Sequence, residues 1–242
     1  MVVVCSALAT QGATPRNVRV LFIGNSLTYV NDLPRMVVAL GAISGVTVTQ
    51  EFVTLPNFSL GDHLLDGRAL AALQRERWDY VVLQQGPTTL LDSRNDLLRA
   101  TRAFAAPIRK SGARAVLYSV WTDRRHAKDI ELVSYSYRMA AKSVDGLLVP
   151  AGDVWSAAWR SDPKIEFYGA DGFHPGAAGT HAAALTMARV LFGPLPAQAT
   201  SLETARAIAG PSLELTATQL QVIVSAVNKT VPTESKARAS SD

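Results

Sequence analysis

Residue types that can perform nucleophilic catalysis stand at two widely separated places in this chain. Ser26 lies in Gly24-Asn25-Ser26-Leu27, and Asp171 and His174 lie in Asp171-Gly172-Phe173-His174-Pro175. A serine hydroxyl becomes a nucleophile when an imidazole takes its proton, and a carboxylate fixes the tautomer of that imidazole and stabilises its charged form. We therefore predict Ser26 as nucleophile, His174 as general base and Asp171 as the carboxylate that orients His174.

Each segment also has a purely structural interpretation. Asn and Ser are common in turns and at helix N-caps, so the segment around Ser26 taken alone is equally typical of a turn. The segment around Asp171 taken alone is typical of a Gly- and Pro-containing loop whose carboxylate caps the next helix. The presence of both in one chain favours catalysis.

Short apolar runs alternate with helical patterns along the chain. Strands are predicted at 18–23, 46–53, 80–84, 115–120 and 147–149, and helices at 33–43, 61–75, 95–110, 127–143 and 176–191. Continuous apolar runs joined by crossover helices are typical of a parallel sheet covered on both faces. We predict an α/β fold, a three-layer α/β/α sandwich whose five-stranded parallel sheet has the flavodoxin-like order 2-1-3-4-5.

The candidate polar residues follow the carboxyl ends of these strands, where the reactive crevice of an open parallel sheet lies. Ser26 follows the first strand, and Gln84 and Gln85 follow the third. Trp121 and Asp123 follow the fourth, where they either line a substrate pocket or pack on the core. Segments far apart in the sequence are therefore expected at one edge of the sheet.

The two end segments resemble blocks of a known family. Gly24-Asn25-Ser26-Leu27 is similar to the first block of the SGNH (GDSL-type) esterases and lipases, with Asn25 in place of the more usual Asp. Asp171-Gly172-Phe173-His174-Pro175 is similar to their last block. The resemblance extends from about Val18 to Leu191. It implies the sandwich fold, no metal or other cofactor, and hydrolysis of a small-molecule or carbohydrate ester through an acyl-enzyme.

The resemblance also implies an oxyanion hole built by the N–H groups of Ser26 and Asn57 and the side chain of Gln85. The second block usually offers a glycine N–H, and Asn57 takes that place here, with Gly61 as an alternative. The third block usually carries Gly-x-Asn. Here it reads Gln84-Gln85-Gly86-Pro87, similar to carbohydrate-esterase branches with Gln-Gly, which favours acetyl esters of sugars and leaves Gln84 as an alternative to Gln85.

Ser59, His63 and His181 are weaker candidates for a catalytic or metal-binding role. Ser59 lies in a segment that lacks the first glycine of a Gly-x-Ser-x-Gly nucleophile elbow. His63 is expected to be structural or to line the pocket wall. His174 and His181 lie two helical turns apart, too far for one small metal ion, and we predict no metal site.

Composition limits the possible partners. The chain has 242 residues and a formal net charge of +4, without a basic stripe interleaved with aromatics, so nucleic acid is not an expected partner. It lacks the roughly 20-residue apolar run of a membrane span. It also lacks Gly-x-Gly-x-x-Gly and phosphate-loop motifs. The main alternative to an esterase is a non-catalytic module that binds carbohydrate or a protein partner. The sequence does not determine the oligomeric state.

We predict a single domain over residues 17–228. Residues 1–16 form an N-terminal segment whose apolar start, ending in Ala-x-Ala, is either a signal-peptide remnant or a loose end, and this slightly favours an extracytoplasmic location. Apolar residues from Leu213 to Val227 share one helical face and are expected to dock on the domain. Residues 229–242 are predicted to be a disordered tail.

Overall fold

The structure is a computed structural model, and it describes residues 16–231. Its sheet consists of β1 (Arg16–Gly24), β2 (Val46–Thr54), β3 (Tyr80–Leu83), β4 (Arg114–Ser119) and β5 (Leu147–Pro150). The five strands are parallel and lie in the order β2-β1-β3-β4-β5. This confirms the predicted sheet and its strand order.

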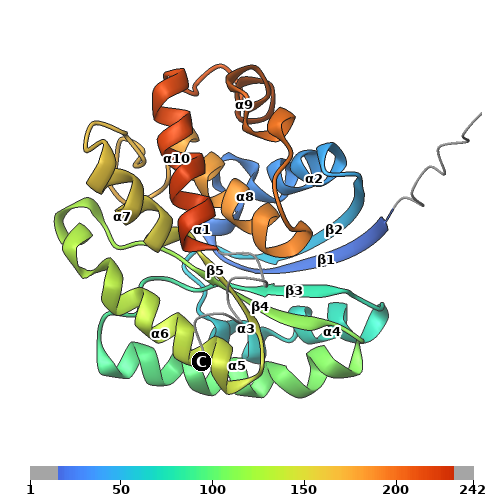
Figure 1. The fold of residues 1–242 in the computed structure, drawn as a ribbon. Coiled ribbons are helices and arrows are strands. Elements are labelled where there is room, and N and C mark those ends of the chain that lie inside the picture. Colours follow the sequence, from blue (N-terminus) through green and yellow to red (C-terminus); the bar gives the residue numbers. More distant parts are fainter. Residues whose placement is uncertain (1–15, 232–242) are drawn as a thin grey trace, which may run out of the picture.

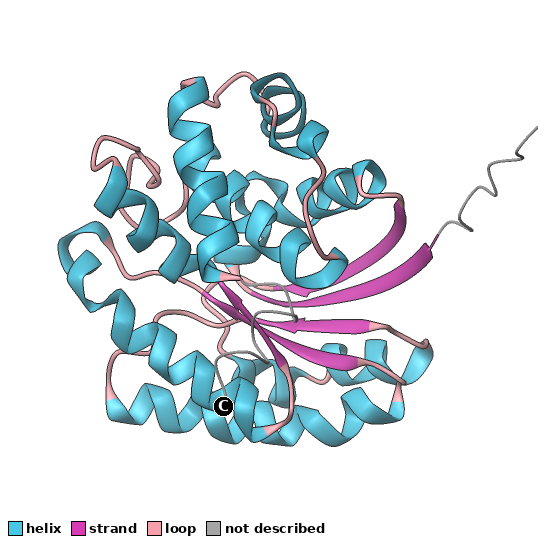
Figure 2. Ribbon diagram, viewed as in Figure 1, coloured by secondary structure: helices cyan, strands magenta, loops and turns pink. Residues whose placement is uncertain are grey.

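Helices cover both faces of the sheet, which makes the three-layer α/β/α sandwich predicted from the sequence (Figure 1, Figure 2). One layer contains α3 (Leu60–Asp66), α4 (Arg68–Arg75), α5 (Leu91–Lys110) and α6 (Ile130–Ser143). The other contains α2 (Leu33–Ile43), α7 (Ala151–Ser161), α8 (Ala177–Phe192), α9 (Leu202–Ala209) and α10 (Ala217–Thr230). Because both faces are covered, residues 20–23 of β1 and 81–83 of β3, two of the three inner strands, are completely buried.

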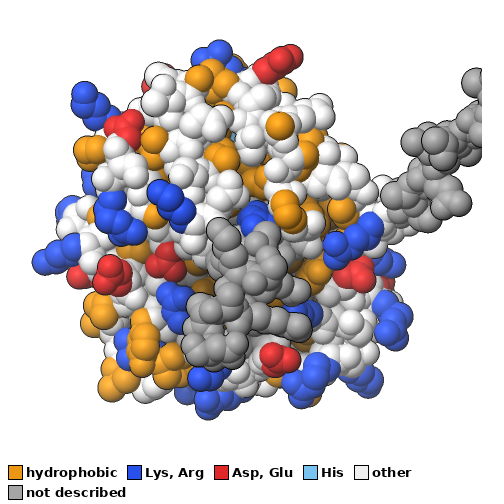
Figure 3. All heavy atoms as spheres, in the orientation of Figure 1, with side chains coloured by type: hydrophobic (Ala, Val, Ile, Leu, Met, Phe, Trp, Pro, Cys, Tyr) orange, Lys and Arg blue, Asp and Glu red, His pale blue; other side chains and the backbone are white. Residues whose placement is uncertain are grey.

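Short helical segments connect some of these elements. They are α1 (Ser26–Tyr29), η1 (Val30–Asp32), η2 (Arg124–Asp129) and η3 (Ala197–Thr200). None of the helices described over residues 16–231 has the length and apolar character needed to cross a bilayer. On the face drawn in Figure 3, basic side chains are interspersed with acidic ones.

The helices differ from the predicted ranges in three places. The helix predicted over 61–75 is divided at Gly67, whose φ of +82° ends α3 before α4 begins. α5 begins at Leu91 rather than at Asn95, and α6 begins at Ile130 after η2. α7 was not predicted at all. Its first residue follows Pro150 directly, so the strand and the helix have no polar linker between them.

The C-terminal helix docks on the domain as predicted. α10 packs against α7 and α8, and Leu220, Val224 and Val227 are buried there. The helix continues to Thr230 and so includes the start of the range predicted as a tail. The predicted N-terminal segment, except for Arg16 at the start of β1, and residues 232–242 lie outside the described part of the chain.

Candidate active site

Ser26 is the first residue of α1 and lies directly beyond the carboxyl end of β1. Asn25 caps this short helix by accepting the N–H of Leu27 at 3.1 Å. Gly24 allows the side chains of Gln84 and Thr28 to lie close to the backbone here, because a Cβ at this position would lie 2.5 Å from Gln84 Oε1 and 2.7 Å from Thr28 Oγ1. Ser26 is partly exposed at the sheet edge.

Asp171 and His174 lie on one tight loop before α8. Gly172 has a φ of +68°, in the region that favours glycine. Asp171 Oδ2 accepts from His174 Nδ1 at 2.5 Å, and its Oδ1 accepts the backbone N–H groups of Phe173 and His174, each at 2.9 Å. The bond from His174 and these backbone donors lower the pKa of Asp171 to about 2, so the carboxylate is ionised at neutral pH.

The structure brings the three predicted residues together. His174 Nε2 lies 2.9 Å from Ser26 Oγ, although the two residues are 148 positions apart in the sequence. Because the carboxylate of Asp171 can only accept, Nδ1 carries the proton in the neutral ring. Nε2 is then unprotonated and faces the hydroxyl hydrogen of Ser26, which is the arrangement that a general base requires.

Neighbouring residues hold the loop that carries His174. Trp121 Nε1 donates to the carbonyl of Phe173 at 3.0 Å, and the N–H of Arg124 donates to the carbonyl of Gly172 at 2.8 Å. Trp121 is completely buried and stacks on Trp155 with ring centroids 3.7 Å apart. Of the two interpretations of Trp121, packing on the core is therefore correct.

Asp123 makes hydrogen bonds within the segment that follows β4. It accepts the N–H of Arg125 at 3.0 Å and so caps η2, and its other oxygen lies 2.8 Å from His126 Nδ1. It also lines a hollow beside Asp171 and Phe173, so its side chain lies near the loop of the candidate triad.

The amide of Gln85 lies in the same pocket as Ser26. Its Oε1 accepts the N–H of Leu60 at 3.1 Å, which fixes the orientation of the amide. Among residues 16–231, no acceptor takes the Nε2 hydrogens of Gln85. These hydrogens are therefore left for a group that enters the pocket.

Gln84 makes a contrasting use of its amide. Its Nε2 donates to Asn25 Oδ1 at 2.9 Å and to the carbonyl of Gln85 at 2.7 Å. Its Oε1 accepts the N–H of Asn25 at 2.9 Å and the hydroxyl of Thr28 at 2.7 Å. The side chain is completely buried with both amide hydrogens in use, so its geometry favours Gln85 over Gln84 as an oxyanion donor.

Asn57 fits the place of the usual glycine in its backbone conformation. Its φ is +60°, a region that glycine enters freely and that Asn enters more readily than most other residues. Asn57 lines the pocket with Ser26, whereas Gly61 lies within α3 and is not among the lining residues. The geometry therefore favours Asn57 over Gly61.

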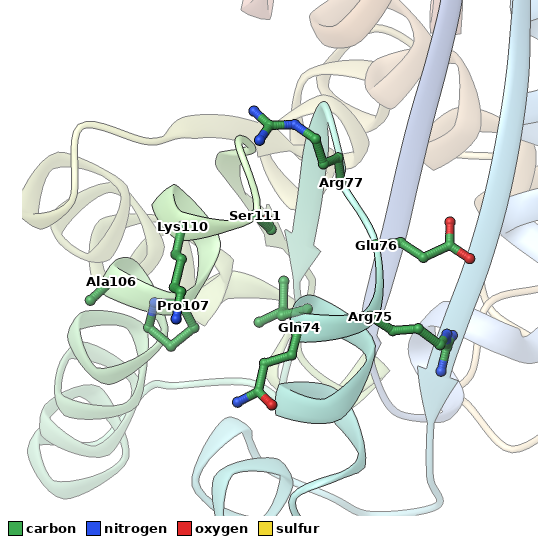
Figure 4. Close-up of a pocket in the computed structure, with 9 residues that line it drawn as sticks. Gln74, Arg75, Glu76, Arg77, Ala106, Pro107, Lys110 and Ser111 are labelled. Atoms are coloured by element: carbon green, nitrogen blue, oxygen red, sulfur yellow. The ribbon is translucent and has the colours of Figure 1, made fainter.

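The pocket above Ser26 is small and its rim is mixed in character. Its volume is about 310 Å³. Phe58, Pro87 and Phe173 supply its apolar surface, and Ser93 and Asp96 at the start of α5 supply polar groups. A larger cavity of about 660 Å³ lies at the opposite edge of the sheet, between the ends of α4 and α5 (Figure 4). That cavity is lined by residues that precede β3 and β4, and Ser26 is not among them.

Ser59 and His63 make structural hydrogen bonds, and His181 is part of the buried interior. Ser59 and Asp62 form a capping box at the start of α3, in which the hydroxyl of Ser59 donates to Asp62 Oδ2 at 2.7 Å. His63 is completely buried, and its Nε2 donates to the carbonyl of Gly24 at 2.8 Å. His181 is buried in α8, and neither of its ring nitrogens has a partner among the described residues.

Sequence reasoning missed Tyr137 of α6. Its hydroxyl accepts the N–H of Gln85 at 3.0 Å and donates to the carbonyl of Gln85 at 2.6 Å. The only sequence signal for Tyr137 is a buried position in a helical pattern, which does not distinguish it from an ordinary core residue.

Comparison with known proteins indicates the family to which this fold and site are similar. No protein-family model matches the chain, and no curated protein sequence matches it significantly. Among solved structures, a provisionally named SGNH hydrolase from Slackia heliotrinireducens is 28% identical, with a TM-score of 0.62 over 73% of this chain and 100% of that one. The chain belongs to the SGNH hydrolase superfamily.

Two more distant structural neighbours have the same fold. A lipase/acylhydrolase from Enterococcus faecalis is 17% identical with a TM-score of 0.56, covering 74% of this chain and 97% of its own. A catalytic mutant of an acetylxylan esterase from Geobacillus stearothermophilus is 14% identical with a TM-score of 0.56, covering 75% of this chain and 96% of its own.

Proposed function

We propose that this SGNH superfamily member is a serine-dependent carboxylic ester hydrolase that works through an acyl-enzyme. The observation that carries the proposal is the hydrogen-bonded chain from Ser26 Oγ to His174 Nε2, at 2.9 Å, and from His174 Nδ1 to Asp171, at 2.5 Å. This order of hydroxyl, imidazole and carboxylate is the one that activates a serine.

In the first half of the proposed reaction, Ser26 Oγ attacks the ester carbonyl carbon while His174 Nε2 takes the hydroxyl proton. Asp171 stabilises the resulting imidazolium. The carbonyl oxygen becomes an oxyanion, which accepts from the N–H groups of Ser26 and Asn57 and from Gln85 Nε2. His174 then returns the proton to the departing alkoxide, which leaves as the alcohol.

In the second half, water attacks the acyl group on Ser26, and His174 acts as general base again. The same donors hold the second oxyanion. When it collapses, the C–O bond to Ser26 breaks, the carboxylic acid leaves and the serine hydroxyl regains its proton. Proton balance is complete within the triad, and the proposed reaction needs no group beyond the chain, the ester and water.

We propose short acyl groups, with acetyl esters of carbohydrates as the first candidates. A pocket of about 310 Å³ is at the low end of the range for ligand sites. Ser93 and Asp96 at its rim offer a hydroxyl and a carboxylate to sugar hydroxyls, and Phe58 and Phe173 offer apolar surface to a pyranose face. The acetylxylan esterase among the structural neighbours also supports this choice.

The test of catalysis is turnover of p-nitrophenyl acetate by the protein and by its Ser26→Ala variant. We expect the variant to lose nearly all activity, because only residual catalysis survives removal of a nucleophile. A fluorophosphonate probe should label the protein and not the variant, whereas a non-catalytic binding module would not be labelled. Unchanged turnover by Ser26→Ala would exclude the proposal.

The acyl and alcohol preferences need a separate measurement. A series of p-nitrophenyl esters of increasing chain length should give the highest kcat/KM at acetyl. Acetylated xylan and acetylated sialic acid then test the sugar, with acetate release as the readout. A preference for long-chain esters would exclude the short-acyl assignment and leave the triad unaffected.

A further inference from the structure

Asn25 occupies a position where SGNH hydrolases more often carry Asp, and its side chain joins two segments of the site. Its Oδ1 accepts the N–H of Leu27 at 3.1 Å and Gln84 Nε2 at 2.9 Å. Its Nδ2 donates to the carbonyl of Phe58 at 3.0 Å. With only 6% of Asn25 exposed, water has little access to replace these bonds.

The two ends of this amide differ in what could replace them. A carboxylate oxygen could serve as the Oδ1 acceptor for Leu27 and Gln84 equally well. No carboxylate could replace Nδ2, because an oxygen there would face the carbonyl oxygen of Phe58, and two acceptors in a buried place repel each other. The contact with Phe58 therefore requires a hydrogen-bond donor at position 25, which the amide supplies and an ionised carboxylate does not.

The bond to Phe58 lies next to a proposed oxyanion donor. Asn57 precedes Phe58, and its segment is tied to the domain on both sides: the N–H of Leu55 donates to Gly24 at 3.1 Å, and the N–H of Leu60 donates to Gln85 Oε1 at 3.1 Å. Between these two hydrogen bonds, Asn25 Nδ2 donates to the carbonyl of Phe58, so the residue after Asn57 is joined to the residue before Ser26. It therefore fixes the Asn57 N–H relative to the nucleophile.

We propose that Asn25 is a positioning residue: its Nδ2 holds the segment around Phe58 so that the Asn57 N–H points at the oxyanion. An ionised carboxylate at position 25 cannot make this hydrogen bond to Phe58. The inference rests on the proposed function, because it gives a role to the oxyanion hole. It predicts an effect on the chemical step, since the oxyanion forms only after substrate has bound.

The experiment compares Asn25→Asp with Asn25→Ala at pH 8, using p-nitrophenyl acetate. Asn25→Asp keeps the acceptor for Leu27 and Gln84, loses the donor to Phe58 and adds a negative charge, whereas Asn25→Ala loses both hydrogen-bonding groups without adding charge. We expect kcat to fall at least about tenfold in both variants, approaching the 10²–10³ that loss of an oxyanion donor costs. KM should stay within about threefold, because substrate binding precedes the affected step.

Two measurements separate positioning from a general loss of structure. Urea unfolding gives the folded fraction of each variant, and fluorophosphonate labelling counts the reactive serines, so that kcat is expressed per labelled site. Ser111→Ala is the matched control, because it removes a buried side-chain hydrogen bond, to the carbonyl of Ile108 at 2.8 Å, at the far edge of the sheet. It should leave kcat unchanged.

The outcomes distinguish this inference from the function on which it rests. If Asn25→Asp keeps the kcat of the unaltered protein, or if its loss equals its unfolded fraction, the positioning role is excluded while Ser26-dependent turnover stands. If Ser26→Ala retains turnover, the proposed function itself fails.

Discussion

The hydroxyl of Tyr137 holds both backbone groups of Gln85, accepting its N–H at 3.0 Å and donating to its carbonyl at 2.6 Å. Because β3 ends at Leu83, Gln85 lies beyond the strand ladder and takes its backbone partner from α6 instead. Two residues that are 52 positions apart thereby fix the direction of the Gln85 side chain.

We predict that Tyr137→Phe lowers kcat about tenfold with little change in KM, because Gln85 Nε2 is then less firmly directed at the oxyanion. The variant should also lose about 1–3 kcal/mol of stability, since the buried N–H of Gln85 loses its partner. Steady-state kinetics and urea unfolding measure the two effects. Tyr135→Phe, at an exposed neighbouring position of α6, is the control and should change neither. Equal effects in the two variants would contradict the prediction.

Gln85→Glu tests the donor itself. The substituted side chain keeps an oxygen for the N–H of Leu60, loses the Nε2 hydrogens and places negative charge where the oxyanion forms. We expect kcat to fall by about 10²–10³ or more. Gln74→Glu, at an exposed position lining the distant cavity, makes the same chemical change away from the site and should have no effect on kcat. A Gln85→Glu variant with normal kcat would remove Gln85 from the oxyanion hole.

The sheet could be predicted because strands that are buried on both faces need continuous apolar runs, and such runs are visible in the sequence. The residues 20–23 and 81–83 are continuous apolar runs, and the helices between them require parallel strands. Ser26 could be predicted because it follows a strand end, where a parallel sheet gathers polar residues, and Asp171 and His174 could be predicted because they lie three positions apart in one loop. Both inferences use patterns within a few residues of each other in the sequence.

What could not be predicted depends on contacts between distant segments. The helical pattern over 61–75 continues through Gly67, and only the positive φ of that residue reveals the break. The choice between Gln84 and Gln85 depends on which amide is already bonded to Asn25 and Thr28 across more than 50 positions. Tyr137 is another such case. Hydrogen bonds between residues so far apart produce no pattern of residue types within a short stretch of sequence.

Asn57 offers a test of whether a backbone group or a side chain acts at its position. If only the N–H donates, Asn57→Gly should keep kcat, because glycine adopts the φ of +60° freely. Asn57→Ala should lose about 1 kcal/mol of stability, since alanine lacks the short polar side chain that lets Asn tolerate this conformation. Kinetics and thermal unfolding of both variants measure this. A loss of kcat in both variants, with the fold intact, would show that the side-chain amide is needed.

The acid stability of the protein should depend on His181. Burial lowers the pKa of His181 to about 4 from an ordinary value of 6.5, and neither ring nitrogen has a partner among residues 16–231. The unfolded chain therefore takes up this proton at a higher pH than the folded one. Stability from this group is fully present above pH 6.5 and is lost progressively as pH falls towards 4.

We predict that His181→Leu reduces the dependence of the unfolding free energy on pH between about 6.5 and 4, by up to about 3 kcal/mol over that interval. Urea unfolding at several pH values measures it. The low pKa of Asp171, about 2, affects the variant and the unaltered protein alike, so it does not obscure the difference between them. An identical slope in His181→Leu and the unaltered protein would mean that the folded state accommodates the charged imidazole, which its unpartnered burial argues against.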